Sequence, residues 1–179
     1  MYSKIGFAIL VLISINYTNL NAQNSRVGEV HTFNSKISLQ PFIKSRDIVT
    51  GSELESYDKP IAFLFWLSSC RPCINEFNAI QKNKIYDEIK GKITMIVVSD
   101  DTPNNYNTAR LIAQKNNWDF NMYFDKYFRL RNNLLNYWYG VPQVLIMDSN
   151  KKIVLHKFGY KKGDEVLLLK SLSSLINSD

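Results

Sequence analysis

Two cysteines and a glutamate lie within one short stretch of the chain, and their spacing suits redox chemistry. Cys70 and Cys73 are separated by two residues and are the two cysteines of the sequence. Glu76 follows three residues after Cys73. A thiolate attacks a disulfide through a mixed-disulfide intermediate, so two neighbouring thiols can open a disulfide on another molecule and close one of their own. The spacing predicts a dithiol redox centre with a Cys70–Cys73 disulfide as its oxidised form.

Two other uses of the cysteine pair are open. A structural zinc site needs about four ligands, and the remaining soft candidates, His31 and His156, are single residues far away in the sequence. A purely structural disulfide would close so small a loop that it would constrain the unfolded chain very little. Both alternatives fit the residues less well than redox chemistry does.

A strand followed by a helix must position this pair. The apolar run 61–67 lies between Pro60 and two serines, Ser68 and Ser69, and is typical of a strand buried on both faces. Cys70 then falls where the next helix begins. The first helical turn presents unpaired backbone N–H groups and the positive end of the helix dipole, and both stabilise a thiolate. We expect the pKa of Cys70 to lie below the free-thiol value of roughly 8.5.

The residues around Cys70 divide the expected roles. Arg71 adds a cation beside the thiolate, and Pro72 suits the first helical turn, where its missing N–H is not needed. Cys73 lies one turn further in, so it should be more buried and less reactive. We expect Cys70 to attack a partner and Cys73 to resolve the mixed disulfide.

Glu76 is the candidate acid–base residue. Side chains three residues apart share a face of a helix and lean toward its N-terminus, so Glu76 can point back toward Cys73. A partly buried carboxylate there would have a raised pKa and could accept the Cys73 proton. The alternative is an exposed glutamate on the helix surface that interacts with the N-terminal dipole.

These residues form a recognisable motif. The pattern W-x-x-x-C-x-P-C-x-x-E, made by Trp66, Cys70, Pro72, Cys73 and Glu76, resembles that of thioredoxin-like proteins, and more narrowly the exported TlpA/ResA branch of thiol–disulfide oxidoreductases. The resemblance implies a proton-transfer role for Glu76. Thioredoxins proper carry a buried acid six residues before the first cysteine, where this chain has Leu64.

The resemblance covers the chain from about residue 36 to its end and implies a thioredoxin fold. That is an α/β domain, 36–179, with a central mixed β-sheet flanked by helices and an N-terminal strand or hairpin extension. Alternating apolar segments favour the same α/β architecture. We expect strands at 30–33, 37–40, 61–67, 92–100, 121–124, 144–148 and 153–158, and helices at 71–90, 106–116, 128–135 and 163–177.

A Gly-Val-Pro element precedes one of these strands. In the fold that the chain resembles, a cis proline at this place lies against the cysteine pair and leaves the preceding backbone free to pair with substrate. We therefore expect a cis Val141–Pro142 bond, the alternative being an ordinary trans proline at a strand edge. The predicted substrate groove consists of Trp66, Arg71, Pro72, Val141 and Pro142.

The start of the chain is typical of an export signal. Lys4 precedes the apolar segment 5–15, which is shorter than the roughly 20 residues of a spanning helix. Ala22 offers a cleavage position, so we expect a signal peptide at 1–22 and a flexible segment at 23–35, with an uncleaved membrane anchor as the alternative. Together with the resemblance, this segment predicts a periplasmic protein.

Charge and composition limit the possible partners. The chain carries 22 Lys and Arg against 16 Asp and Glu, a net charge of +6, and because the excess is spread along the sequence it indicates a solvated surface rather than a nucleic-acid site. No metal, nucleotide or flavin is implied. The expected partners are proteins that carry a disulfide or a dithiol, with a membrane electron donor or acceptor.

The resemblance implies that the protein is a reductant, for example in cytochrome c maturation. There are two alternatives: an oxidant or isomerase with the same fold, or a non-catalytic interaction module with the thioredoxin fold.

Overall fold

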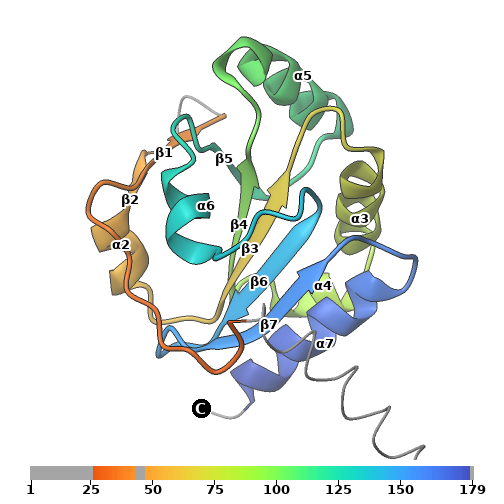
Figure 1. The fold of residues 1–179 in the computed structure, drawn as a ribbon. Coiled ribbons are helices and arrows are strands. Elements are labelled where there is room, and N and C mark those ends of the chain that lie inside the picture. The colour runs from red at the N-terminus through yellow and green to blue at the C-terminus, as the bar shows by residue number, and fades with distance from the viewer. Residues whose placement is uncertain (1–25, 43–46, 178–179) are drawn as a thin grey trace, which may run out of the picture.

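A mixed β-sheet forms the centre of the protein (Figure 1). The computed structural model describes residues 26–42 and 47–177, so the predicted signal peptide, 1–22, lies outside the described residues. The sheet has seven strands in the order β2-β1-β5-β4-β3-β6-β7. Among the described residues, no helix combines the length and the apolar character that crossing a membrane requires.

The middle strand, β3 (Ile61–Trp66), connects the parallel and antiparallel parts of the sheet. It pairs in parallel with β4 (Thr94–Ser99), which pairs in parallel with β5 (Asn121–Phe124). On its other side it pairs antiparallel with β6 (Gln143–Met147), and β7 (Ile153–Phe158) continues the sheet antiparallel to β6. The mixed sheet predicted from the sequence is confirmed.

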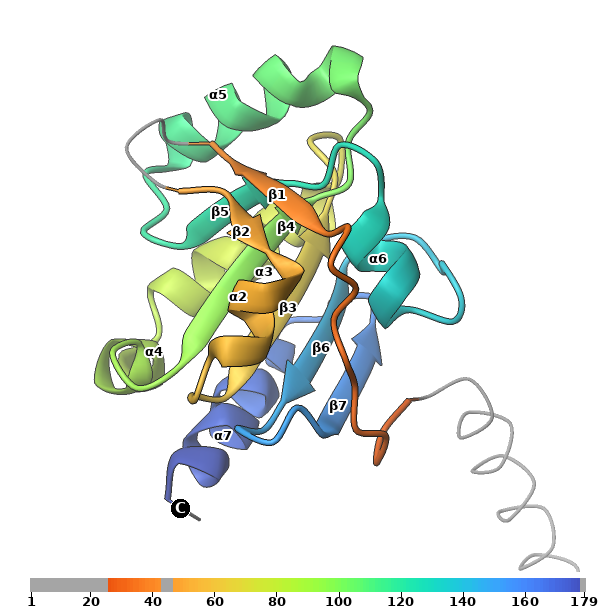
Figure 2. The same cartoon turned by 90° about the vertical axis from the view of Figure 1, so that its left-hand side faces the viewer.

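An N-terminal hairpin extends the sheet at the other edge, as predicted. Strands β1 (Ser38–Pro41) and β2 (Val49–Thr50) pair antiparallel, and β1 also pairs antiparallel with β5. Helix α2 (Gly51–Ser56) starts directly after β2 with a capping box, in which Thr50 and Glu53 bond each other's backbone N–H groups. Figure 2 shows this hairpin facing the viewer.

Helices cover both faces of the sheet, and every residue of β3 is therefore buried. Successive side chains of a strand point to opposite faces, so Ala62, Leu64 and Trp66 join one core cluster and their neighbours join the other. Four helices cover the first face: α3 (Arg71–Gln81), α4 (Lys84–Ile89), α5 (Tyr106–Asn116) and α7 (Asp164–Ile176). Helices α2 and α6 (Arg129–Leu134) cover the second. In Figure 2, α4, α5 and α7 lie to the left of the sheet and α6 to the right.

The single helix predicted for 71–90 is wrong, because the chain forms two helices there. Helix α3 ends at Gln81 and α4 starts at Lys84. Between them the side chain of Asn83 accepts a hydrogen bond from the Ile85 N–H at 3.0 Å, which caps the second helix. Apolar residues of both helices enter the same core cluster, and this is why the apolar periodicity continues across the break.

The strand predicted at 30–33 is also wrong, since Val30 alone forms an isolated bridge, to Lys152. The Gly28 N–H donates to the Ile153 carbonyl at 2.7 Å, and the His31 N–H donates to the Lys151 carbonyl at 3.0 Å. This part of the chain therefore lies along the start of β7.

Candidate redox-active dithiol site

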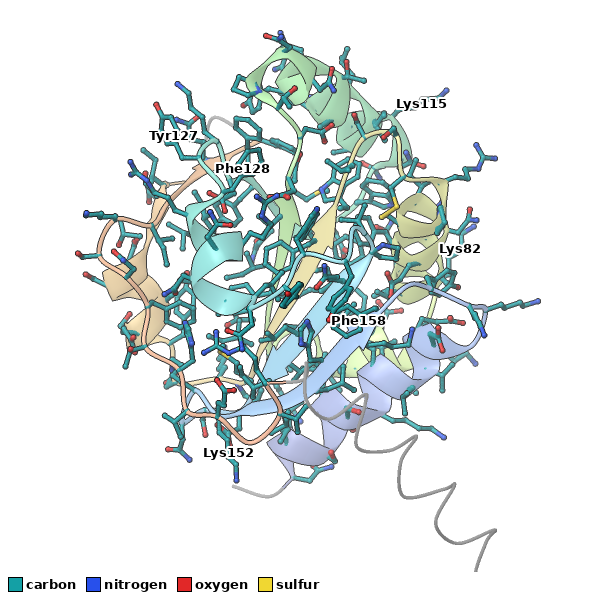
Figure 3. The ribbon with its side chains drawn as sticks, viewed as in Figure 1. Lys82, Lys115, Tyr127, Phe128, Lys152 and Phe158 are labelled. Carbon is teal, nitrogen blue, oxygen red and sulfur yellow. A yellow bond between two sulfur atoms is a disulfide. The ribbon has the colours of Figure 1, made fainter. Side chains whose placement is uncertain are left out.

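Cys70 and Cys73 form a disulfide at the start of α3. The chain leaves β3 at Trp66 and turns, with the Cys70 N–H donating to the Leu67 carbonyl at 2.9 Å. Cys70 is the N-cap of α3, and its Sγ accepts a hydrogen bond from the Cys73 N–H at 3.2 Å. Figure 3 shows the disulfide in yellow at the N-terminal end of α3. The strand–turn–helix placement predicted from the sequence is confirmed.

The two sulfur-bearing residues differ in access to solvent. Cys70 is 9% exposed and Cys73 is 0% exposed, while Arg71 and Pro72 between them are exposed. The surface around the disulfide is thus formed in part by Arg71 and Pro72. An incoming molecule can reach Cys70 more easily than Cys73, as the two roles expected from the sequence require.

Glu76 is a buried carboxyl group three residues after Cys73 on α3. Its side chain is 1% exposed, and its Oε2 atom has no hydrogen-bond partner among the described residues. The pKa of Glu76 is raised to about 8, mainly because burial disfavours the charged form; nearby Lys157 lowers the pKa, and Asp164 and Glu165 raise it by smaller amounts. The alternative of an exposed surface glutamate is therefore wrong. With the disulfide closed, the group is mostly protonated at neutral pH.

Lys157 is a charged neighbour of Glu76 that the sequence analysis missed. It lies on β7, and its Nζ donates to Asp164 Oδ2 at 2.6 Å and to the Gly159 carbonyl at 2.8 Å. The ammonium group is thus paired with Asp164, and it only moderates the effect of burial on Glu76. Because Lys157 is 81 residues beyond Glu76 in the sequence, no local pattern connects the two.

The peptide bond between Val141 and Pro142 is cis, as predicted. Phe65 of β3 is the register partner of Gln143, so Pro142, one residue before Gln143, falls opposite Trp66, at the end of the sheet from which the dithiol loop leaves. Pro142 is buried, and its carbonyl accepts a hydrogen bond from the Gly159 N–H at 2.8 Å. Val141 is partly exposed and packs against both core clusters.

Trp66 lies beneath the site, which corrects the prediction that it lines the substrate groove. Its side chain is 0% exposed. The ring packs edge-on against Phe77 and Trp118, with centroid separations of 5.8 and 5.7 Å, and against Phe42 at 6.5 Å. A residue with no exposed surface cannot contact a substrate, so Trp66 supports the dithiol loop from within the core.

Asp101 is a second residue of the site that the sequence analysis missed. It is 2% exposed and accepts hydrogen bonds from the backbone N–H and the hydroxyl of Ser68, at 2.8 and 2.7 Å. The Ser99 hydroxyl also donates to it, at 2.8 Å. A signal was present in the sequence: Asp100 and Asp101 end a buried strand, and carboxyl ends of adjacent parallel strands meet at one edge of the sheet.

The neighbouring Asp100 links the end of β4 to the segment before Pro142. It forms an ion pair with Arg131, whose guanidinium lies 4.7 Å from the centroid of the Trp138 ring. Trp138 packs edge-on against Phe65 of β3 at 6.4 Å. Burial raises the pKa of Asp100 to about 6 and Arg131 opposes this shift, so the pair is ionised above about pH 6.

Several solved protein structures are similar to the structure of this chain. No protein-family model and no curated protein sequence matches the chain. An uncharacterised thioredoxin-like protein from Porphyromonas gingivalis is 28% identical, with a TM-score of 0.64 over 83% of this chain and 95% of that one. A putative protein disulfide isomerase from Bacteroides thetaiotaomicron is 17% identical, with a TM-score of 0.69 over 84% and 90%. A putative thiol:disulfide interchange protein DsbE from Chlorobium tepidum is 19% identical, with a TM-score of 0.64 over 83% and 98%. The chain has the thioredoxin fold.

Proposed function

We propose that this protein is a thiol–disulfide oxidoreductase that reduces disulfides of other proteins through Cys70 and Cys73, and that it belongs to the TlpA/ResA branch of thioredoxin-like proteins. The observation that carries the proposal is the disulfide itself, which joins a partly accessible Cys70 at the N-cap of α3 to a fully buried Cys73. The thioredoxin fold of the chain supports the same activity.

The first step begins with the reduced protein. The Cys70 thiolate attacks one sulfur of a substrate disulfide, forms a mixed disulfide, and releases the other substrate sulfur as a thiolate. The N–H of Cys73 already donates to Cys70 Sγ, and the same bond, with the first turn of α3, stabilises a negative charge on that sulfur. Exposed Arg71 adds a positive charge next to it.

The second step resolves the mixed disulfide and needs a base for Cys73. We assign this role to the deprotonated form of Glu76, which is buried with Cys73 on α3 and whose pKa is about 8 when the disulfide is closed. A base with a pKa close to that of a thiol exchanges a proton with it readily. The Cys73 thiol gives its proton to Glu76, its thiolate attacks Cys70 Sγ, and the substrate sulfur leaves and takes up the proton. The balance is one substrate disulfide reduced to a dithiol and one protein dithiol oxidised to a disulfide.

The signal-like segment at the start of the sequence, together with this chemistry, supports a proposal for the location and the partners of the protein. We propose export by the leader 1–22 to the periplasm, where an oxidising environment closes unprotected thiol pairs. A reductant there needs electrons, so a membrane electron donor would reopen the Cys70–Cys73 disulfide after each cycle. Its substrates would be disulfide-bearing proteins of the cell envelope, for example those of cytochrome c maturation.

Reduction of insulin tests the activity. The full chain with dithiothreitol as electron source should accelerate insulin reduction, and Cys70→Ser should abolish the acceleration while the melting temperature of that variant stays close to that of the reduced protein. Lys82→Gln, at the exposed C-cap of the same helix (Figure 3), is the matched control and should keep full activity. If the wild-type chain does not accelerate reduction, or if Cys70→Ser remains active, the proposal fails.

A further inference from the structure

A cavity lies between α5 and strand β5 of the sheet, apart from the dithiol. Its volume is about 200 Å³. The apolar part of its wall consists of Phe42, Ala113, Trp118, Phe120 and Met122, and the polar part includes Arg110 and Gln114 of α5. The residues that line this cavity do not include Cys70, Cys73, Glu76 or Pro142. The mechanism proposed above makes no use of this cavity.

Arg110 is the charged group of this cavity, and it makes no ion pair within the part of the chain that the structure describes. Its Nε atom is buried and lacks a hydrogen-bond partner there, and no ion pair of the described residues includes Arg110. A guanidinium has five N–H donors and no acceptor, in a planar fork that matches a carboxylate. A carboxylate, with two acceptor oxygens, matches this fork.

The walls and the volume restrict what else that anion carries. Three aromatic side chains and one methionine favour an apolar body, because they can stack on a ring or pack against an alkyl chain. Sites for drug-sized ligands measure roughly 300–1,000 Å³, so this ligand is smaller. A benzene molecule fits an apolar protein cavity of about 150 Å³, and one ring with a carboxylate is therefore of suitable size.

We propose that this cavity binds a small free monocarboxylate with an apolar body, such as a single-ring or short-chain acid. The carboxylate lies on the guanidinium of Arg110, and the apolar body packs among Phe42, Trp118 and Met122. The proposal is independent of the disulfide-exchange function, because the two sites share no residue.

Benzoate is the probe, and benzamide, which has the same shape without the charge, is its matched control. In calorimetric titrations of the full chain, benzoate should bind at least tenfold more tightly than benzamide, and acetate, which lacks the ring, should bind far more weakly. The indole N–H signal of Trp118 should shift in NMR spectra on addition of benzoate. Equal binding of benzoate and benzamide, or no binding of benzoate, would overturn the proposal.

Variants separate the charge from the cavity. Arg110→Gln should abolish the preference for benzoate over benzamide, whereas Lys115→Gln, an exposed position on the same helix (Figure 3), should leave it unchanged. Ala113→Met fills the cavity from α5 and should remove binding of both ligands. Melting curves establish that each variant is folded. Unchanged benzoate binding in both Arg110→Gln and Ala113→Met would also contradict the proposal.

Discussion

Asp101 holds Ser68 by two hydrogen bonds, one from the backbone N–H at 2.8 Å and one from the hydroxyl at 2.7 Å. Ser68 lies two residues before Cys70, in the turn that leads from β3 into α3. Asp101 follows the neighbouring strand, β4. The position of the dithiol loop is therefore fixed in part by the end of a different strand, and this contact should matter for both stability and exchange.

Replacing Asp101 by alanine should destabilise the protein. It leaves the Ser68 N–H and the hydroxyls of Ser68 and Ser99 without their acceptor, and a buried donor left unsatisfied costs roughly 1–3 kcal/mol. We expect a loss of about 2–4 kcal/mol in the free energy of unfolding, measured in urea. Glu88→Ala, on the exposed side of α4, is the control and should change it by less than about 0.5 kcal/mol. Equal stability of the two variants would contradict the role given to Asp101.

Replacing Cys73 should trap the first intermediate of the proposed reaction. In Cys73→Ser, the Cys70 thiolate can still attack a substrate disulfide, but no second thiol remains to release the product. We expect a stable mixed disulfide that non-reducing electrophoresis and mass spectrometry detect. Cys70→Ser, with its remaining thiol fully buried, should form little or none. Equal trapping by both variants would refute the division of roles.

Glu76 should make the stability of the oxidised protein fall as the pH rises. Its pKa is about 8 in the folded protein against an ordinary 4.5, so between these values the folded state keeps a proton that the unfolded state loses. Folding then becomes less favourable by up to about 1.4 kcal/mol for each unit of pKa difference. Glu76→Gln removes this effect, so its stability relative to wild type should increase from pH 4.5 to pH 8 by a few kcal/mol.

Urea unfolding of both proteins across this pH range measures the difference. Glu88→Gln, at an exposed position on α4, is the control and should follow the wild-type curve at every pH. If the curves of wild type and Glu76→Gln run parallel, the pKa of Glu76 is not raised.

Glu76→Gln should also slow one step of the reaction and spare the other. A positioned general base typically contributes 10²–10⁴-fold to rate, so we expect release of the substrate from the mixed disulfide to slow by about 10²-fold. The attack of Cys70 should change little, because Glu76 is not its base. Rapid-quench experiments with a fluorescent disulfide peptide measure the two steps separately. An unaffected release step would show that Cys73 uses another base.

The sequence predicted the local part of the site well. The apolar run 61–67, its bounding Pro60 and the Pro72 after Cys70 all act on their immediate neighbours, so the strand, the turn and the helix start could be inferred. The cis Val141–Pro142 bond was predicted from the family resemblance and is present. The break at Asn83 could not be inferred from apolar periodicity, because both helices pack on one core.

The long-range part of the site required the structure. The hydrogen bond between Ser68 and Asp101 joins residues 33 positions apart, and Lys157 approaches Glu76 from the far edge strand. Trp66 belongs to the motif, but a motif does not tell on which face of a strand a side chain lies. Because the odd and even positions of β3 are both buried, the pattern of apolar residues in the sequence could not distinguish the two faces either.

The reduction potential of the Cys70–Cys73 pair decides whether the protein can act as a reductant. The full chain is equilibrated with mixtures of reduced and oxidised dithiothreitol or glutathione, and the free thiols are alkylated and counted by mass. We expect reversible two-electron exchange with a potential near that of thioredoxin, about −270 mV. A value near about −120 mV would make the protein an oxidant rather than a reductant. A pair that does not exchange with either reagent would rule out thiol–disulfide exchange as the function of this protein.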